Sequence, residues 1–255
     1  MNGSVPSSRA VAITYRVLLR QLVSRGRIIA LSLIGAVVAL LGWVVGRARD
    51  DDVFLPTEFN DQIRLDDAVA TVTNIGFTIL VPIVSLVFAA AALGDTREDG
   101  TLVYLWLRPM KRWPIVVGAW LAAVTVSLPL VVIPMSVSAY LHDVGSELVI
   151  GAALGSVIGV VAYSAMFVLL GLFVKNGIVW GLAYIIIWEG VVAAFGSAAA
   201  KVAMRGYTSS IVSERTGVEI DIGTLAQSTA IVVPIVVAIF ALWFASVRLQ
   251  NLEVA

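Results

Sequence analysis

Six stretches of the sequence are apolar and long enough, or nearly so, to cross a lipid bilayer. A helix rises about 1.5 Å per residue, so about 20 apolar residues cross a hydrocarbon core roughly 30 Å thick. The only formally charged side chain in the six stretches is Glu189, which is the pattern expected of helices surrounded by lipid tails. The stretches are residues 28–45, 68–93, 113–141, 148–174, 177–200 and 225–247. They predict an all-α membrane protein with six transmembrane helices.

The composition supports this class and excludes several others. Of the 255 residues, 60% are hydrophobic and 13% are charged, whereas soluble domains average roughly 45–50% and 25%. The formal net charge is zero and no basic block is interleaved with aromatic residues, so we expect no nucleic-acid partner. The chain has no cysteine, which excludes disulfides, thiolate metal sites and cysteine nucleophiles.

The basic residues predict the orientation of the chain in the membrane. Residues 1–27 contain five arginines and no acidic residue, so we expect the amino terminus to be cytoplasmic. Six alternating spans then place eleven lysines and arginines on the cytoplasmic side and six on the outer side. Both termini are therefore predicted to be cytoplasmic, in a multi-pass protein of the cell (plasma) membrane. The first span lacks a cleavage site before the acidic segment that follows it, so we predict a retained helix rather than a signal peptide.

Residues 1–27 are predicted to form a cytoplasmic tail and an interfacial amphipathic helix. Val11, Tyr15, Leu18 and Leu22 recur at helical spacing. A second stripe, which we expect to face lipid phosphates, contains Arg9, Arg16, Arg20 and Arg27. An unstructured basic tail is the alternative. Residues 28–247 are predicted to form the transmembrane domain, and residues 248–255 a cytoplasmic tail.

Small residues and prolines inside the spans indicate close packing and bends. Glycine recurs every four residues at Gly151, Gly155 and Gly159, and again at Gly177 and Gly181, a spacing that lets a second helix approach closely. Four prolines inside spans each remove a helical hydrogen bond and favour a kink. They are Pro82, Pro129, Pro134 and Pro234.

The cytoplasmic segment between the second and third spans, residues 94–114, is dense in charge and then amphipathic. Asp95 can cap a helix start, with Glu98 three residues later. An apolar stripe follows at Leu102, Leu105 and Trp106, and Pro109 ends the helix. This pattern predicts a short cytoplasmic helix tied to two spans, on which a cytosolic partner could act. An ordinary solvated connector is the alternative.

The same segment resembles the signature of ABC-2 type permeases, the membrane subunits of one class of ATP-driven ABC exporters. The pattern is an acidic pair, Gly-Thr, a leucine-rich helix, a proline with a basic residue three positions later, and a Gly-Lys pair. The matching residues are Glu98, Asp99, Gly100, Thr101, Leu105, Pro109, Arg112 and Gly118. Ala119 stands where the pattern has lysine. The segment 184–190, Tyr-Ile-Ile-Ile-Trp-Glu-Gly, is also similar to smaller bacterial members, and the six-span layout agrees.

This resemblance implies a permease that works as a dimer, homomeric or heteromeric, in contact with membrane lipids. It also implies that the cytoplasmic loop is a coupling helix that docks on a separate cytosolic ABC ATPase subunit. The expected docking residues are Glu98, Asp99, Gly100, Thr101, Leu105, Arg108, Pro109 and Arg112. The chain has no phosphate-binding loop motif, so ATP and magnesium are expected on the partner. We predict no catalytic residue, metal site or cofactor in this chain.

Glu189 and Gly190 are the candidate gate or substrate-path residues. Because a charge in the middle of a span is costly, Glu189 is expected to be protonated, paired or facing water. Gly190 and the Ala/Gly-rich stretch after it predict a helix break and an outer re-entrant segment between spans 5 and 6. Lys201 or Arg205 could then pair with Glu189. A fixed buried contact that only orients helices and a role in proton coupling are the alternatives.

Two other classes of protein compete with an ATP-driven permease. A proton- or ion-coupled secondary transporter could use Glu189, but such transporters often show an internal repeat, and we find none. An intramembrane enzyme needs catalytic residues, whereas the lone His142 lies in a predicted outer loop. The nearly uncharged spans favour a hydrophobic or amphipathic substrate.

Overall fold

The computed structural model describes residues 6–48, 57–98, 111–191, 202–220 and 225–251, and all elements in these ranges are helices. The α-helices are α1 (Ser7–Leu22), α2 (Arg25–Ala48), α3 (Thr57–Thr71), α4 (Val81–Glu98), α6 (Trp113–Leu141), α7 (Ser146–Phe173), α8 (Gly177–Ala183), α10 (Met204–Thr216) and α11 (Gln227–Asn251). Two π-helices complete the set: η1 (Val72–Leu80) joins α3 to α4, and η2 (Tyr184–Val191) continues α8.

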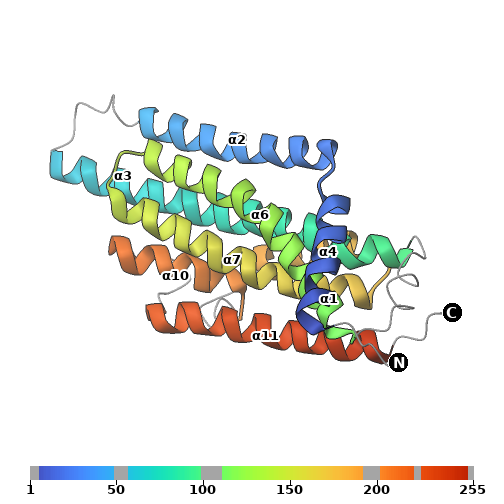
Figure 1. Ribbon diagram of the computed structural model, residues 1–255. Coiled ribbons are helices and arrows are strands. Elements are labelled where there is room, and N and C mark those ends of the chain that lie inside the picture. Colours follow the sequence, from blue (N-terminus) through green and yellow to red (C-terminus); the bar gives the residue numbers. More distant parts are fainter. Residues whose placement is uncertain (1–5, 49–56, 99–110, 192–201, 221–224, 252–255) are drawn as a thin grey trace, which may run out of the picture.

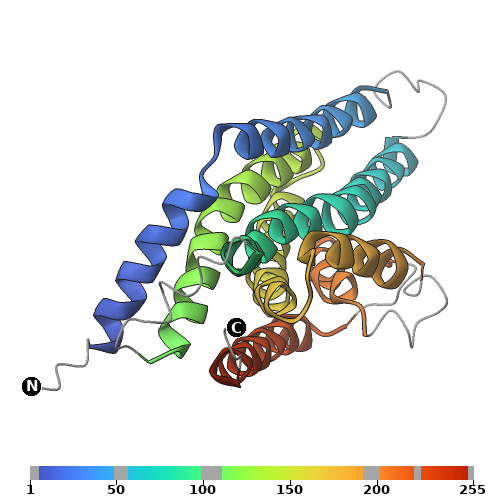
Figure 2. The same ribbon diagram turned by 90° about the vertical axis from the view of Figure 1, so that its right-hand side faces the viewer.

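The long helices lie side by side in a bundle with α7 at its centre (Figure 1). Helix α7 packs against α4, α6, α10 and α11, while α2 lies on the outer side of α6. Helix α1 stands across one end of the bundle rather than along it, and it packs on α6 (Figure 2).

Five described helical stretches are long and apolar enough to cross a membrane. They are Arg25–Arg47, Asp61–Thr96, Trp113–Leu141, Ser146–Phe173 and Gln227–Gln250. A sixth apolar helix, Gly177–Val191, is shorter; the rest of the predicted fifth span, 192–200, lies outside the described residues. The structure therefore agrees with a multi-span helical membrane protein, and the number six stays a prediction.

The glycines of α7 make the close helix packing that their spacing predicts. A Cβ atom built at Gly151 would lie 3.2 Å from the Cα atom of Val212, and one at Gly155 would lie 3.0 Å from the carbonyl oxygen of Thr208. Both neighbours belong to α10. Since Gly151 precedes Gly155 while Val212 follows Thr208, α10 runs antiparallel to α7. The missing side chains thus allow α10 to lie directly on α7.

The second predicted span contains a π-helix immediately before Pro82. Proline has no N–H, and its ring clashes with the carbonyl four residues earlier, which belongs to Thr78. The wider η1 turn avoids this clash, and the backbone N–H of Val81 bonds the carbonyl of Gly76, five residues back. π-Helical turns occur frequently at functional sites, so Thr78 and its neighbours are candidates for such a site.

Helix α1 contacts α6 at Gly118, one of the residues of the permease-like signature. A Cβ atom at Gly118 would lie 2.9 Å from Thr14 Cβ and 3.0 Å from the backbone nitrogen of Tyr15. The buried residues of α1 are Ala10, Thr14, Leu18 and Leu22. The two leucines belong to the predicted apolar stripe, and its other members, Val11 and Tyr15, are half-buried.

Candidate functional site

The candidate site is the junction where η1, η2 and the first turn of α10 meet in the interior of the bundle. The two π-helices contact each other, and α10 contacts η1. Glu189 stands on η2, which continues α8. Its side chain is fully buried. A buried carboxylate needs several hydrogen-bond donors to compensate for lost hydration.

The Glu189 carboxylate accepts three hydrogen bonds. Oε1 accepts one from the Tyr184 hydroxyl at 3.0 Å and one from the backbone N–H of Met204 at 3.0 Å. Oε2 accepts one from the backbone N–H of Arg205 at 3.1 Å. The first N–H groups of a helix have no partner within the helix, and the residue before α10, Ala203, supplies no side-chain cap. Glu189 therefore caps α10 from another helix, where the helix dipole favours negative charge.

Arg205 links the same helix start to η1. Its guanidinium Nη1 donates to Thr78 Oγ1 at 3.1 Å, and Thr78 lies in the π-helical turn that precedes Pro82. Arg205 contacts Glu189 through its backbone N–H and not through its guanidinium. The expected ion pair between the side chains of Glu189 and Arg205 is thus not seen among the described contacts, and Lys201 lies outside the described residues. The first turn of α10 is held on one side by η2 and on the other by η1.

Aromatic rings from α7 and η2 enclose the junction. Tyr163 and Phe167 stack with ring centroids 5.8 Å apart, and Phe167 meets Tyr184 edge-on at 6.2 Å. The Tyr163 side chain is fully buried, and within the described part of the chain its hydroxyl has no hydrogen-bond partner. The Glu189 carboxylate is thus buried and hydrogen-bonded, and aromatic rings border it.

The sequence pointed to Glu189 but not to its surroundings. Thr78 and Tyr163 carry no charge and belong to no motif, and residues 192–201, which lie between η2 and α10, are outside the described residues. The one available signal for Thr78 was Pro82, four residues later. Gly190 lies in η2, and the residues after Val191, where the break and re-entrant segment are predicted to follow, lie outside the described residues up to position 201.

The predicted docking residues are only partly described. Glu98 is the last described residue of α4, and Asp99, Gly100, Thr101, Leu105, Arg108 and Pro109 lie outside the described residues. Arg112 is described and lies just before α6, where its guanidinium donates to the backbone carbonyls of Leu249 and Gln250 at 3.2 and 2.6 Å. Ala119, at the position where the pattern has lysine, is fully buried.

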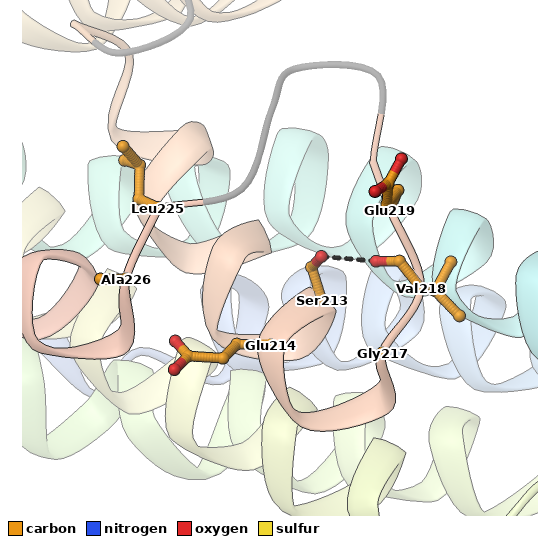
Figure 3. Close-up of a pocket in the computed structure, with 7 residues that line it drawn as sticks. All are labelled: Ser213, Glu214, Gly217, Val218, Glu219, Leu225 and Ala226. Atoms are coloured by element: carbon orange, nitrogen blue, oxygen red, sulfur yellow. Dashed lines mark hydrogen bonds between the residues drawn. The ribbon is translucent and has the colours of Figure 1, made fainter.

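A separate pocket of about 260 Å³ lies between the end of α10 and the start of α11. Ser213, Glu214, Gly217, Val218, Glu219, Leu225 and Ala226 line it. Glu214 and Glu219 are exposed and point away from each other (Figure 3). Ser213 donates a hydrogen bond to the Val218 carbonyl, which fixes the turn after α10. We regard this pocket as a solvated surface feature, because its carboxylates do not converge.

Residues 19–204 match the sequence profile of the ABC-2 family transporter proteins. The match covers well over half of the chain and includes the signature segment, α7 and Glu189, and it ends at Met204, the first residue of α10. The chain belongs to the ABC-2 transporter family. No curated protein and no solved structure matches it.

Membership of the ABC-2 family defines the general role of the chain. It is the membrane component of an ABC transporter, a multi-pass permease that is not itself the catalytic subunit. The family implies association with an ABC ATPase subunit. The helical bundle and its five long apolar stretches agree with this assignment.

Proposed function

We propose that this ABC-2 permease exports a hydrophobic or amphipathic substrate, using ATP hydrolysed by a separate cytosolic subunit that binds ATP and magnesium. The family match over residues 19–204 is the main support. The sequence adds that this chain has no phosphate-binding loop motif of its own. The direction of transport follows from the resemblance to exporters.

The exposed helix faces support an apolar substrate and a partner within the membrane. Helices α2 and α11 and the α8–η2 helix expose rows of aliphatic and aromatic side chains. Examples are Ile29 and Leu33 on α2, Trp180 on α8, and Phe240 and Trp243 on α11. Surfaces of this kind face lipid, a second permease chain or an apolar substrate. We propose a dimer, in which two such surfaces enclose the transport path.

We propose six spans in the plasma membrane, with both termini cytoplasmic and an outer re-entrant segment between spans 5 and 6. The antiparallel packing of α10 on α7 supports the re-entrant segment. Thr208 lies near the middle of α7, beside Gly155, and Val212 lies nearer its amino-terminal end, beside Gly151. Helix α10 would therefore begin deep in the bundle and run outward. Backbone at such depth is tolerated only where protein or a water-filled cavity covers it, and Glu189 covers the first N–H groups.

Within this transporter, Glu189 and Gly190 are proposed to hold the re-entrant segment against the path. The carboxylate is fully enclosed and accepts three donors. That arrangement favours a fixed anchor over proton coupling, since a proton carrier needs access to water. A gate role requires in addition that the anchor release during transport, which transport assays of Glu189 variants can test.

The docking proposal is tested by variants of the cytoplasmic loop. Leu105→Asp or Gly100→Pro should spoil the predicted coupling helix without changing a span, so the bundle should fold while the ATPase detaches or uncouples. Tyr104→Asp, on the opposite face of the predicted helix, is the matched control. Co-purification of the ATPase subunit and its stimulation by the permease are the two readouts. Wild-type values for both disruptive variants would remove this docking role.

A further inference from the structure

Two charged contacts lie at the two ends of the segment that connects α4 to α6. On the α4 side, Arg27 Nη2 donates to Asp95 Oδ2 at 2.7 Å. On the α6 side, the Arg112 guanidinium donates to the carbonyls of Leu249 and Gln250. The first contact reaches the base of α2 and the second reaches the base of α11.

The Arg27–Asp95 ion pair joins two helices that otherwise pack elsewhere. Helix α2 packs mainly on α6, with smaller contacts to α3 and η1, whereas α4 packs mainly on α7 and α6. Arg27 lies in the first turn of α2 and Asp95 in the last turn of α4. Both side chains are about one-third exposed, at 34% and 29%, so the pair is partly shielded from water. A displacement of the end of α4 therefore acts directly on the base of α2.

Arg112 performs two functions at one position. Its main-chain carbonyl accepts the N–H of Ile115 at 3.0 Å, which begins α6. Its guanidinium bonds the carbonyls of Leu249 and Gln250 in the last described turn of α11, toward the carboxyl end of the helix, where the helix dipole favours a cation. A guanidinium offers several donors in a fixed plane, so it can hold both carbonyls at once. The start of α6 is thereby tied to the end of α11.

The two helices reached by these contacts are the peripheral ones. Buried residues make up 22% of the most apolar window of α2 and 33% of that of α11, against 72% for the helix that contains α4. Loosely packed helices can shift at lower cost than the tightly packed centre formed by α4, α6 and α7. Within one chain, the contacts therefore link the ends of the loop to the two least buried of the long apolar helices.

Building on the proposed function, we infer that Arg27, Asp95 and Arg112 are positioning residues that transmit loop motion to the first and last spans. When the ATPase subunit moves the loop, the Arg27–Asp95 pair carries the displacement to α2. The Arg112 contact carries it to α11. Arg112 then acts inside the permease, in place of the docking role expected from the signature.

The test measures transport per ATP hydrolysed in proteoliposomes that contain the permease with its ATPase subunit. Arg27→Gln, Asp95→Asn and Arg112→Gln should each lower this ratio by about 2- to 30-fold, the range of typical coupling energies, with the ATPase subunit still bound. The charge exchange Arg27→Asp with Asp95→Arg should restore most of the ratio. Arg112→Lys should restore part of it. The exposed neighbours Arg25→Gln and Lys111→Gln are the controls.

The outcomes separate the inference from the proposed function. Wild-type ratios in all three single variants would overturn the inference while leaving the proposed function intact. Loss of the ATPase subunit from Arg112→Gln would make Arg112 a docking residue and overturn its transmission role. Failure of the charge exchange to restore the ratio would overturn the role of the Arg27–Asp95 pair. If wild-type permease showed neither an associated ATPase nor ATP-driven transport, both proposals would fail together.

Discussion

The Glu189 carboxylate and the backbone N–H of Arg205 lie 3.1 Å apart, although the two residues are sixteen positions apart in the chain. Through this contact one helix supplies the cap that the next helix lacks. The arrangement explains how a helix start can lie deep inside an apolar bundle without leaving unpaired N–H groups. Glu189, the single charged residue of the predicted spans, thus has defined hydrogen-bond donors.

Glu189→Gln should destabilise the bundle even though it preserves the shape of the side chain. An amide has one acceptor oxygen, so the N–H of Met204 or of Arg205 would face an NH₂ group. A buried donor left unsatisfied costs about 1–3 kcal/mol, and we expect the free energy of unfolding to fall by that amount. Thermal unfolding of the purified protein measures it.

Glu147→Gln is the control, because Glu147 pairs with Arg215 at 3.1 Å on the surface with its side chain 57% exposed. Exposed pairs of this kind contribute about 0–1 kcal/mol. Equal effects of the two substitutions would contradict the capping role. Normal stability of Glu189→Gln combined with altered transport would instead support a gate or coupling role.

Gly118→Ala should loosen α1 from the bundle. The added methyl group would lie 2.9 Å from Thr14 Cβ and 3.0 Å from the Tyr15 backbone nitrogen, and overpacking typically costs about 1–3 kcal/mol. A cysteine placed at the fully buried position Ala10 should then react faster with a maleimide, in a chain that has no other cysteine.

The matched substitution is Gly26→Ala, because a Cβ atom at Gly26 has no neighbour within 4 Å. This variant should leave the reactivity at position 10 unchanged. Unchanged reactivity in Gly118→Ala as well would show that α1 does not depend on close approach to α6.

His142 should make stability depend on pH below about 6.5. Burial lowers the pKa of His142 below its ordinary value of 6.5; the hydrogen bond from Nδ1–H to the Ser138 carbonyl and the charge of Asp67 oppose this shift. Between the native pKa and 6.5, the unfolded chain binds a proton that the native protein does not bind. The free energy of unfolding should therefore fall as pH decreases through this window and be flat above it.

His142→Asn should flatten the pH dependence in that window. Thermal unfolding of wild type and variant between pH 8 and pH 5 gives the comparison. A wild-type curve that rises toward low pH would mean that the buried imidazole is charged in the native protein.

The proposed topology predicts which positions react from each side of the membrane. Single cysteines at Asp51 and Glu214 should be labelled by an impermeant maleimide added to intact cells. Cysteines at Ser4, Asp99 and Leu252 should react only after the membrane is opened. Labelling of position 99 in intact cells would overturn the six-span arrangement.

The sequence predicted the parts of the fold that depend on hydropathy and on small residues. Third and fourth spans were expected at 113–141 and 148–174, and the helices are Trp113–Leu141 and Ser146–Phe173. Close packing at Gly151 and Gly155 was also expected, since a four-residue glycine repeat has one common structural use.

The parts that the sequence did not predict depend on tertiary contacts. The π-helical turns have no compositional signature, and only Pro82 marks one of them. The partners of Glu189 are mainly backbone N–H groups, which every residue has, so no residue type could identify them. Likewise, nothing in the signature indicates that Arg112 bonds the end of α11, because that contact uses main-chain carbonyls.

ATP hydrolysis by proteoliposomes tests the central claim most directly. The experiment compares three samples: the purified chain alone, an ABC ATPase subunit recovered with it from native membranes, and the two together. We expect no hydrolysis by the chain alone, and hydrolysis by the complex that Leu105→Asp in the permease reduces. Recovery of the chain without any ATPase subunit, together with transport driven by a proton gradient and abolished by Glu189→Gln, would contradict the account and identify a secondary transporter.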